Sequence, residues 1–257
     1  MELKTVDLAV ETHGEGVPLV LLHGFPLNRS IWKPIIPLLK EKARLILPDL
    51  RGYGESPKDI EEYSMRLLAA DVVALLNRLQ VDKVVLAGHS MGGYVALEFA
   101  HAYPNRLSGL ALIASQADAD SPERRQARLI TAREVRRKGI KYIADGMPSK
   151  LTHDESIQQE LKRIISSNPV RVIEAALKAM ADRRDANPWL PGIKVPLVAV
   201  AGGKDQLIPV EKVTTLSKLA AKGWSVEIPE AGHMPMMEAP DQVGDALTQL
   251  ICASNGC

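Results

Sequence analysis

The fold is decided by the stretch 84–98, which reads Val84-Val85-Leu86-Ala87-Gly88-His89-Ser90-Met91-Gly92-Gly93-Tyr94-Val95-Ala96-Leu97-Glu98. It begins as a short apolar run typical of a buried strand and ends as an amphipathic helical pattern. Between them, residues 88–92 match G-x-S-x-G, in which a serine occupies a strained turn that lifts its hydroxyl above the sheet. Side chains at Gly88 or Gly92 would collide with the neighbouring helix or strand. The stretch therefore makes Ser90 a candidate nucleophile.

Length and composition limit the kind of protein. A chain of 257 residues fits one sizeable domain or two small ones, and α/β folds often reach this size as one domain. A net charge of +1 gives no reason to expect nucleic acid or a charged membrane as partner. No secretory leader or bilayer-length apolar run is visible, which predicts a cytoplasmic protein. The two cysteines, Cys252 and Cys257, are expected as thiols in a frayed tail, and a homo-oligomer stays open.

Apolar runs alternate with helical periods on both sides of this stretch. We expect strands at 17–22, 44–47, 107–114, 195–201 and 225–228, and helices near 30–40, 63–79, 210–221 and 241–252. Ser30 is the expected N-cap of the first helix. Residues 3–12 and the Gly-containing segment after them predict a hairpin-type connection. The alternation indicates a parallel sheet with helices on both faces.

Residues 116–190 interrupt the alternation. They show helical patterns and no convincing strand, with Ser121-Pro122-Glu123 and Asn168-Pro169 as helix starts. We therefore expect one core domain, made of 1–115 and 191–257, with a helical cap subdomain of residues 116–190 inserted over the site.

A serine hydroxyl needs a base to take its proton, and the base needs an acid to orient it. Asp205 follows the strand predicted to end at Ala201, and His233 follows the strand predicted to end at Ile228. Both lie at carboxyl ends of strands, where open α/β sheets bind ligands. We therefore expect a triad of Ser90, Asp205 and His233. Asp118, which also follows a strand, is the rival acid.

Two backbone N–H groups must stabilise the oxygen that becomes negative in the tetrahedral intermediate. Met91 follows the nucleophile and lies at a helix N-terminus, so its N–H is one candidate. The loop His23-Gly24-Phe25-Pro26 follows the first buried strand and offers the Phe25 N–H. Pro26 has no N–H to donate.

Together these motifs resemble the α/β-hydrolase fold family across nearly the whole chain. The H-G-x loop at 23–25, the D-x-R-G-x-G-x-S loop at 49–56, the elbow at Ser90, the G-x-x-D loop at Asp205 and the G-H loop at His233 occur in the family's order. The resemblance implies a doubly wound, mostly parallel eight-stranded sheet. It also implies acyl transfer from an ester-like substrate to water through an acyl-enzyme.

Within the family the sequence is most similar to small esterases, enol-lactonases and cofactor-free haloperoxidase-like perhydrolases. The serine nucleophile disfavours haloalkane dehalogenase and epoxide hydrolase chemistry, and Pro26 keeps perhydrolase activity open. Asp49 and Arg51 are expected to form a structural network near the oxyanion loop. His23 is expected to brace that loop, and His89 is expected to point away from the position of the base.

The substrate pocket is harder to place from sequence. Apolar residues in the site loops and the cap are the candidates: Met91, Met147, Trp189, Leu207 and Met234. The first cap helix is strongly basic, with Arg124, Arg125, Arg128, Arg133, Arg136, Arg137 and Lys138. A solvated helix face is the expected role for these residues, and an anionic substrate or partner is the alternative. No histidine has metal-ligand spacing, so neither a metal nor a cofactor is expected.

These observations predict a serine hydrolase that cleaves small to medium apolar carboxylic esters. A lactonase or a cofactor-free perhydrolase shares every catalytic group, and only substrate profiling separates them. A protein of another class, a ligand sensor that keeps the triad but turns over slowly, is a further alternative. The expected partner is a small-molecule ester or lactone.

Overall fold

The computed structural model describes residues 3–58 and 61–255. Its centre is a sheet with the strand order β1-β3-β2-β4-β5-β6-β7. All neighbouring strands are parallel except β1 and β3, which are antiparallel. The strands are β1 (Val10–His13), β2 (Val17–Leu22), β3 (Ala43–Pro48), β4 (Val84–His89), β5 (Leu107–Ile113), β6 (Leu197–Gly202) and β7 (Gly223–Ile228). The predicted doubly wound, mostly parallel sheet is confirmed.

The sheet has seven strands in the described residues, whereas eight were expected. Residues 3–9 are the N-terminal segment that could have supplied another strand, but side chains bond several of their backbone groups. The Val6 N–H donates to Asp71 (2.9 Å), and the Ala9 N–H donates to the Ser56 hydroxyl (2.9 Å). Backbone groups that are bonded in this way are not available for hydrogen bonds to a neighbouring strand.

The expected hairpin at the N-terminus is also wrong. β1 and β2 are joined by the short segment 14–16, yet β1 pairs with β3, with Val10 opposite Pro48. β2 lies on the other side of β3 and runs parallel to it, with Val17 opposite Ala43. β1 is therefore an edge strand, and β2 lies inside the sheet.

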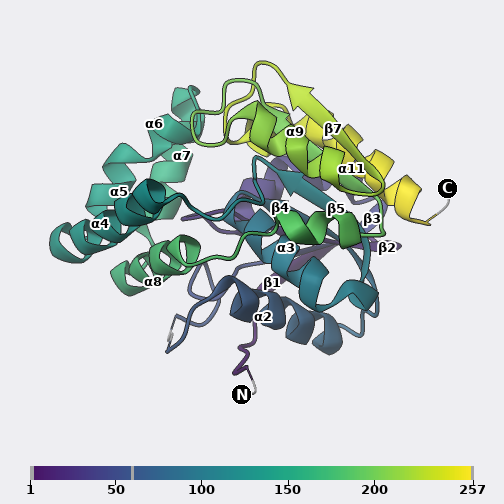
Figure 1. Ribbon diagram of the computed structural model, residues 1–257, viewed down its shortest axis with the longest axis horizontal. Helices are drawn as coiled ribbons and strands as arrows, with labels where there is room; N and C mark the ends of the chain where they lie inside the picture. The colour runs from purple at the N-terminus through teal and green to yellow at the C-terminus, as the bar shows by residue number, and fades with distance from the viewer. Residues whose placement is uncertain (1–2, 59–60, 256–257) are drawn as a thin grey trace.

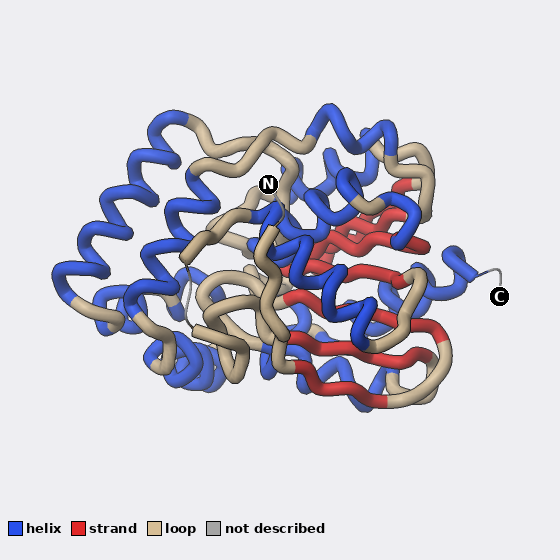
Figure 2. The backbone as a smooth tube through the Cα atoms, turned by 90° about the horizontal axis from the view of Figure 1, so that it is seen from below, coloured by secondary structure: helices blue, strands red, loops and turns tan. Residues whose placement is uncertain are grey.

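Helices cover both faces of the sheet, as Figure 2 shows. α1 and α11 contact each other, α2 packs against α3, and α9 lies over β6 and β7. The central strands are buried on both sides, which explains why they read as continuous apolar runs. These helices are α1 (Ile36–Leu39), α2 (Met65–Arg78), α3 (Met91–Ala102), α9 (Val210–Leu219), α10 (Pro235–Glu238) and α11 (Pro240–Asn255); 3₁₀ turns are η1 (Arg29–Ile35), η2 (Pro104–Arg106) and η3 (Asn187–Gly192).

Two details differ from the sequence predictions. The first helical segment is capped by Asn28, whose side chain accepts from the Ser30 N–H (3.0 Å), so Ser30 is not the N-cap. Cys252 lies exposed on α11 rather than in a frayed tail, while Cys257 is outside the described residues. No helix in residues 3–58 or 61–255 combines the length and apolar character that a membrane span requires.

The segment 116–190 is helical, and Figure 1 shows its helices gathered at one side of the sheet. They are α4 (Pro122–Lys138), α5 (Lys141–Gly146), α6 (Pro148–Leu151), α7 (Glu155–Ser166) and α8 (Val170–Ala181). Ser121 caps α4, as predicted, by accepting from the Arg124 N–H (3.2 Å). α8 begins after Pro169, and Asn168 instead donates to the Pro26 carbonyl (2.8 Å), which ties this segment to the loop after β2.

Candidate active site

Ser90 lies on the tight turn between β4 and α3. Its backbone has φ 51° and ψ −113°, a conformation that costs a non-glycine residue on the order of 1–3 kcal/mol. The Ser90 carbonyl accepts from the Gly93 N–H (2.9 Å) and the Ser115 hydroxyl (2.9 Å), which hold the turn. A Cβ at Gly92 would lie 2.6 Å from the Leu22 carbonyl oxygen, so the helix approaches the sheet more closely than alanine permits.

A hydrogen-bonded chain joins the three residues that the sequence singled out. The Ser90 Oγ lies 2.9 Å from His233 Nε2, and His233 Nδ1 lies 2.7 Å from Asp205 Oδ2. An ionised carboxylate only accepts hydrogen bonds, so Nδ1 carries the proton and Nε2 accepts from the serine hydroxyl. The three side chains follow β4, β6 and β7, whose carboxyl ends lie at the same edge of the sheet.

Asp205 is held in place by its own loop. Its second oxygen, Oδ1, accepts from the N–H groups of Leu207 (2.7 Å) and Ile208 (3.1 Å), and the side chain is buried with His233. The rival acid, Asp118, lies elsewhere: it contacts the Asn187 amide (3.2 Å) and Lys212 (3.2 Å). The structure therefore joins Asp205, and not Asp118, to the histidine.

His89 supports the His233 loop. Its Nε2 donates to the His233 carbonyl (2.8 Å), since a carbonyl cannot donate, and Nδ1 is left buried without a partner. Burial, and then the nearby charge that His233 can carry, hold the pKa of His89 well below its ordinary value. The ring is therefore neutral, and its hydrogen bond orients the loop of the base, whereas the Ser90 hydroxyl is bonded to His233.

Glu238 is a second support of the same loop, and no sequence motif pointed to it. Its Oε2 accepts from the Gly232 N–H (2.9 Å) and the Met234 N–H (3.1 Å), on either side of His233. Its Oε1 accepts from the Thr152 hydroxyl (2.6 Å) in the helical segment. The His233 loop is thus fixed from the core and from residues 116–190 together.

The loop after β2 is braced by His23, as expected. The Leu50 N–H donates to His23 Nε2 (2.9 Å), and His23 Nδ1 donates to the Gly24 carbonyl (3.0 Å). Burial lowers the pKa of His23, so the ring stays neutral in this arrangement. The next residue, Phe25, borders the same cavity as Ser90, while the Met91 N–H is in the first turn of α3 and has no acceptor within the helix.

Asp49 and Arg51 belong to two separate structural contacts. Asp49 is paired with Arg29 and accepts from the Glu55 N–H (2.9 Å), which closes the loop after β3. Arg51 forms a bidentate pair with buried Asp71 (2.7 and 2.8 Å). Neither side chain borders the cavity beside Ser90.

A cavity of about 100 Å³ lies beside the triad. It is lined by Phe25, Ser90, Tyr94, Arg124, Arg128, Met147, Met180, Leu207, Ile208 and His233. A larger space of about 380 Å³ lies farther out and shares Phe25, Arg124, Arg128, Met147 and Leu207 with it. Of the expected pocket residues, Met147 and Leu207 border both spaces, whereas Met91 and Met234 are buried and border neither.

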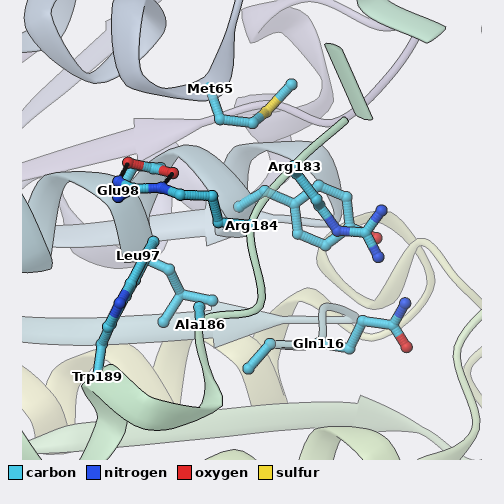
Figure 3. Close-up of a pocket in the computed structure, with 10 residues that line it drawn as sticks. Met65, Leu97, Glu98, Gln116, Arg183, Arg184, Ala186 and Trp189 are labelled. Carbon is cyan, nitrogen blue, oxygen red and sulfur yellow. Dashed lines mark hydrogen bonds and ion pairs between the residues drawn. The ribbon is translucent and has the colours of Figure 1, made fainter. Parts of the chain in front are cut away.

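Trp189 lies away from the triad. Its ring stacks on His101 with centroids 4.2 Å apart, and the Arg184 guanidinium lies 4.7 Å from its centre. Figure 3 shows it lining a small separate pocket with Leu97 and Ala186. The structure therefore does not bring Trp189 to the cavity that contains Ser90.

Two arginines of α4 line the cavities together with the apolar residues. Arg124 and Arg128 line both cavities, although the basic residues of this helix were expected on a solvated face. That expectation describes Arg136 and Arg137, whose side chains are 77% and 68% exposed. Residues 124 and 128 lie one helical turn apart, which places them on the same face, but only the packing of α4 decides which face meets the site.

The described residues contain no cluster of three or more His, Cys, Asp or Glu side chains that could hold a metal ion. The arrangement that they do contain is a hydrogen-bonded chain of serine, histidine and aspartate beside a cavity, with the histidine and aspartate side chains buried. Such a chain can activate a hydroxyl for attack on a carbonyl carbon.

Comparisons with known proteins agree with this geometry. Residues 17–240 match the family model described as alpha/beta hydrolase fold. The chain is 30% identical to a pimeloyl-[acyl-carrier protein] methyl ester esterase of Aeromonas hydrophila, covering 92% of this chain and 96% of that one. The solved structure of a thermophilic esterase from Thermogutta terrifontis superposes with a TM-score of 0.92 at 37% identity, covering 96% and 94% of the two chains.

A third relative is the dihydrolipoyllysine-residue acetyltransferase component of the acetoin cleaving system of Pseudomonas putida. It is 34% identical over 92% of this chain, and the chain spans 64% of its length. The family match covers most of the sequence, and the chain belongs to the α/β hydrolase superfamily. Its esterase relatives place it in the esterase branch, as a hydrolase.

Proposed function

We propose that the protein is a serine carboxylic ester hydrolase with Ser90 as nucleophile, His233 as base and Asp205 as the acid that orients it. The observation that carries the proposal is the unbroken hydrogen-bonded chain from Asp205 to the Ser90 hydroxyl, which borders a cavity of about 100 Å³. The esterase from T. terrifontis, at 37% identity, supports an ester as the substrate.

In the proposed reaction, Ser90 Oγ attacks the ester carbonyl carbon while His233 Nε2 takes the hydroxyl proton. The N–H groups of Phe25 and Met91 stabilise the oxyanion, and His233 returns the proton to the leaving alcohol. Water then attacks the acyl-enzyme through the same base, which releases the acid and restores the serine. Asp205 holds the Nδ1 proton and stabilises the imidazolium that forms.

In this proposal residues 1–115 and 191–257 form the catalytic core, and residues 116–190 form a cap that bounds the pocket. Three contacts support that role: Met147 borders the cavity, the Leu151 carbonyl accepts from the His233 N–H (2.9 Å), and Thr152 contacts Glu238. The cap thus takes part in positioning the base as well as in shaping the pocket.

The test is turnover of p-nitrophenyl butyrate and covalent labelling by a serine-reactive phosphonate. We expect Ser90→Ala to abolish both the turnover and the labelling, because no other hydroxyl among the described residues forms a hydrogen bond with the His233 side chain. Asp205→Asn should lower kcat far more than Asp118→Asn, which serves as the matched control. Wild-type-like turnover by Ser90→Ala would overturn the mechanism, and a larger loss in Asp118→Asn would move the acid.

A further inference from the structure

The arginine and lysine side chains that line the two cavities beside Ser90 give them a positive charge that no lining carboxylate balances. Arg124 and Arg128 border both of them, and Lys150 borders the outer one. No aspartate or glutamate is among the described residues that line either space. A neutral, apolar ester would not require this arrangement, since guanidinium groups that face a pocket in excess over carboxylates cost desolvation when the pocket fills.

One buried carboxylate, that of Asp120, binds these arginines but balances only one of their positive charges. The fully buried Asp120 side chain accepts from Arg128 Nε (2.5 Å) and Arg183 Nη1 (2.6 Å), and Arg124 Nε lies 3.4 Å away. Burial by itself would raise the pKa of Asp120, but the hydrogen bonds and charges of Arg128 and Arg183 hold it below its ordinary value. Three guanidinium groups therefore share one negative charge.

The arginines differ in how much of their hydrogen-bonding capacity is already used. Arg183 donates to the Met180 carbonyl (2.8 Å) and the Asp118 carbonyl (2.7 Å) besides Asp120, and it does not border the cavity of Ser90. Arg128 points its Nη1 at the Met180 sulfur, 3.5 Å away. A thioether is a weak acceptor, so an anionic oxygen in the cavity would be a stronger partner for this group.

We propose that Arg124 and Arg128 form a subsite for a carboxylate that the ester substrate carries in addition to its scissile bond. The planar guanidinium matches a carboxylate with two parallel hydrogen bonds, and Asp120 holds Arg128 in position before the substrate arrives. Because the same cavity contains Ser90 and both arginines, one small molecule can reach the nucleophile and the subsite together. This inference rests on the proposed esterase function and narrows its substrate to anionic esters.

The experiment compares matched esters with and without the charge. Ethyl hydrogen adipate is compared with ethyl hexanoate, which tests a carboxylate on the acid part. 4-Acetoxybutanoate is compared with butyl acetate, which tests it on the alcohol part. We expect the wild-type protein to favour the anionic member of one pair by about tenfold or more in kcat/KM, the size of a charge-assisted contact.

Arg124→Gln and Arg128→Gln should each reduce that preference about tenfold. Arg136→Gln is the matched control, because it removes the same charge from α4 at an exposed position and should keep the wild-type preference. Arg128→Gln could fail to fold, because Arg128 is the ion-pair partner of buried Asp120. In that case Arg124→Gln, at a partly exposed side chain, is the variant that tests the subsite. Preference for the neutral ester in both pairs, or equal ratios in Arg124→Gln and Arg136→Gln, would overturn the inference.

Binding without turnover separates this inference from the proposed function. Calorimetry with Ser90→Ala should detect binding of the intact ester ethyl hydrogen adipate at least tenfold tighter than binding of neutral ethyl hexanoate, and adding Arg124→Gln should remove the difference. Equal affinity for ethyl hydrogen adipate with and without Arg124→Gln would refute the subsite even if esterase activity is established. Retained turnover in Ser90→Ala would instead refute the proposed mechanism and leave the calorimetric result to decide the subsite.

Discussion

The Gly92→Ala substitution tests the reasoning about the turn that presents Ser90. A Cβ at position 92 would lie 2.6 Å from the Leu22 carbonyl oxygen and 2.8 Å from the His23 carbonyl oxygen. Both atoms are backbone, at and just beyond the end of the buried strand β2, so neither can rotate away as a side chain would. The start of α3 must therefore move off the sheet, or β2 must bend.

The size of the effect follows from two opposing contributions. Overpacking of a buried site costs about 1–3 kcal/mol, and two rigid carbonyls place this site at the upper end. Alanine gains up to about 1 kcal/mol over glycine as a helix former. We therefore expect Gly92→Ala to lower the free energy of unfolding by about 2 kcal/mol. Because the shift also displaces the Met91 N–H, kcat on p-nitrophenyl butyrate should fall at least about tenfold.

The assay is urea unfolding with linear extrapolation, together with steady-state kinetics below the transition. Gly146→Ala is the matched control: a Cβ there meets no atom within 4 Å, and the residue ends α5 without a positive φ. It should be at least as stable as wild type. If Gly92→Ala unfolds within about 0.5 kcal/mol of wild type and keeps its kcat, the close approach of α3 to β2 is not what requires glycine.

Three further predictions concern the supports of the site. His23 and His89 have pKa values held below the ordinary 6.5, so on acidification the unfolded chain binds protons before the folded chain does. The free energy of unfolding should therefore decrease as the pH is lowered from about 6.5, by up to about 1.4 kcal/mol per pH unit for each histidine. An increase in this free energy between pH 6.5 and 5.5, measured by urea titration, would contradict the prediction. Asp71→Ala should lower the free energy of unfolding by about 3–5 kcal/mol in the same assay, because it leaves the Arg51 charge buried without its carboxylate. Asp7→Ala, at a side chain that is 87% exposed, is the control and should lower it by less than about 0.5 kcal/mol. Equal losses in the two variants would show that burial of the ion pair does not matter. Glu238→Ala should lower kcat about tenfold with little change in KM, since it frees the His233 loop without touching the cavity, and an unchanged kcat in a folded variant would show that the loop needs no such support.

Much of the site could be anticipated because its parts are local. The turn at Ser90 and the loops of Asp205 and His233 each follow a strand that is visible as an apolar run. In a parallel sheet the carboxyl ends of the strands share an edge, so the order of the elements already places these side chains near one another. The supports were less visible: Glu238 acts through backbone N–H groups of a loop, and no spacing in the sequence announces such contacts.

The sequence by itself determined the fold class, the family and the three side chains that the structure joins by hydrogen bonds. Only the tertiary structure decided the number of strands and the lining of the cavity. Residues 3–9 show a partial strand-like alternation, yet side chains distant in sequence, such as Asp71, bond part of their backbone, and the described residues form no eighth strand in the sheet. Likewise, a helix pattern predicts a basic α4 but not its rotation. The packing of α4 against α8, which buries Ala132 and Val135, decides that rotation, and it places Arg124 and Arg128 at the cavity of Ser90 while Trp189 stays outside.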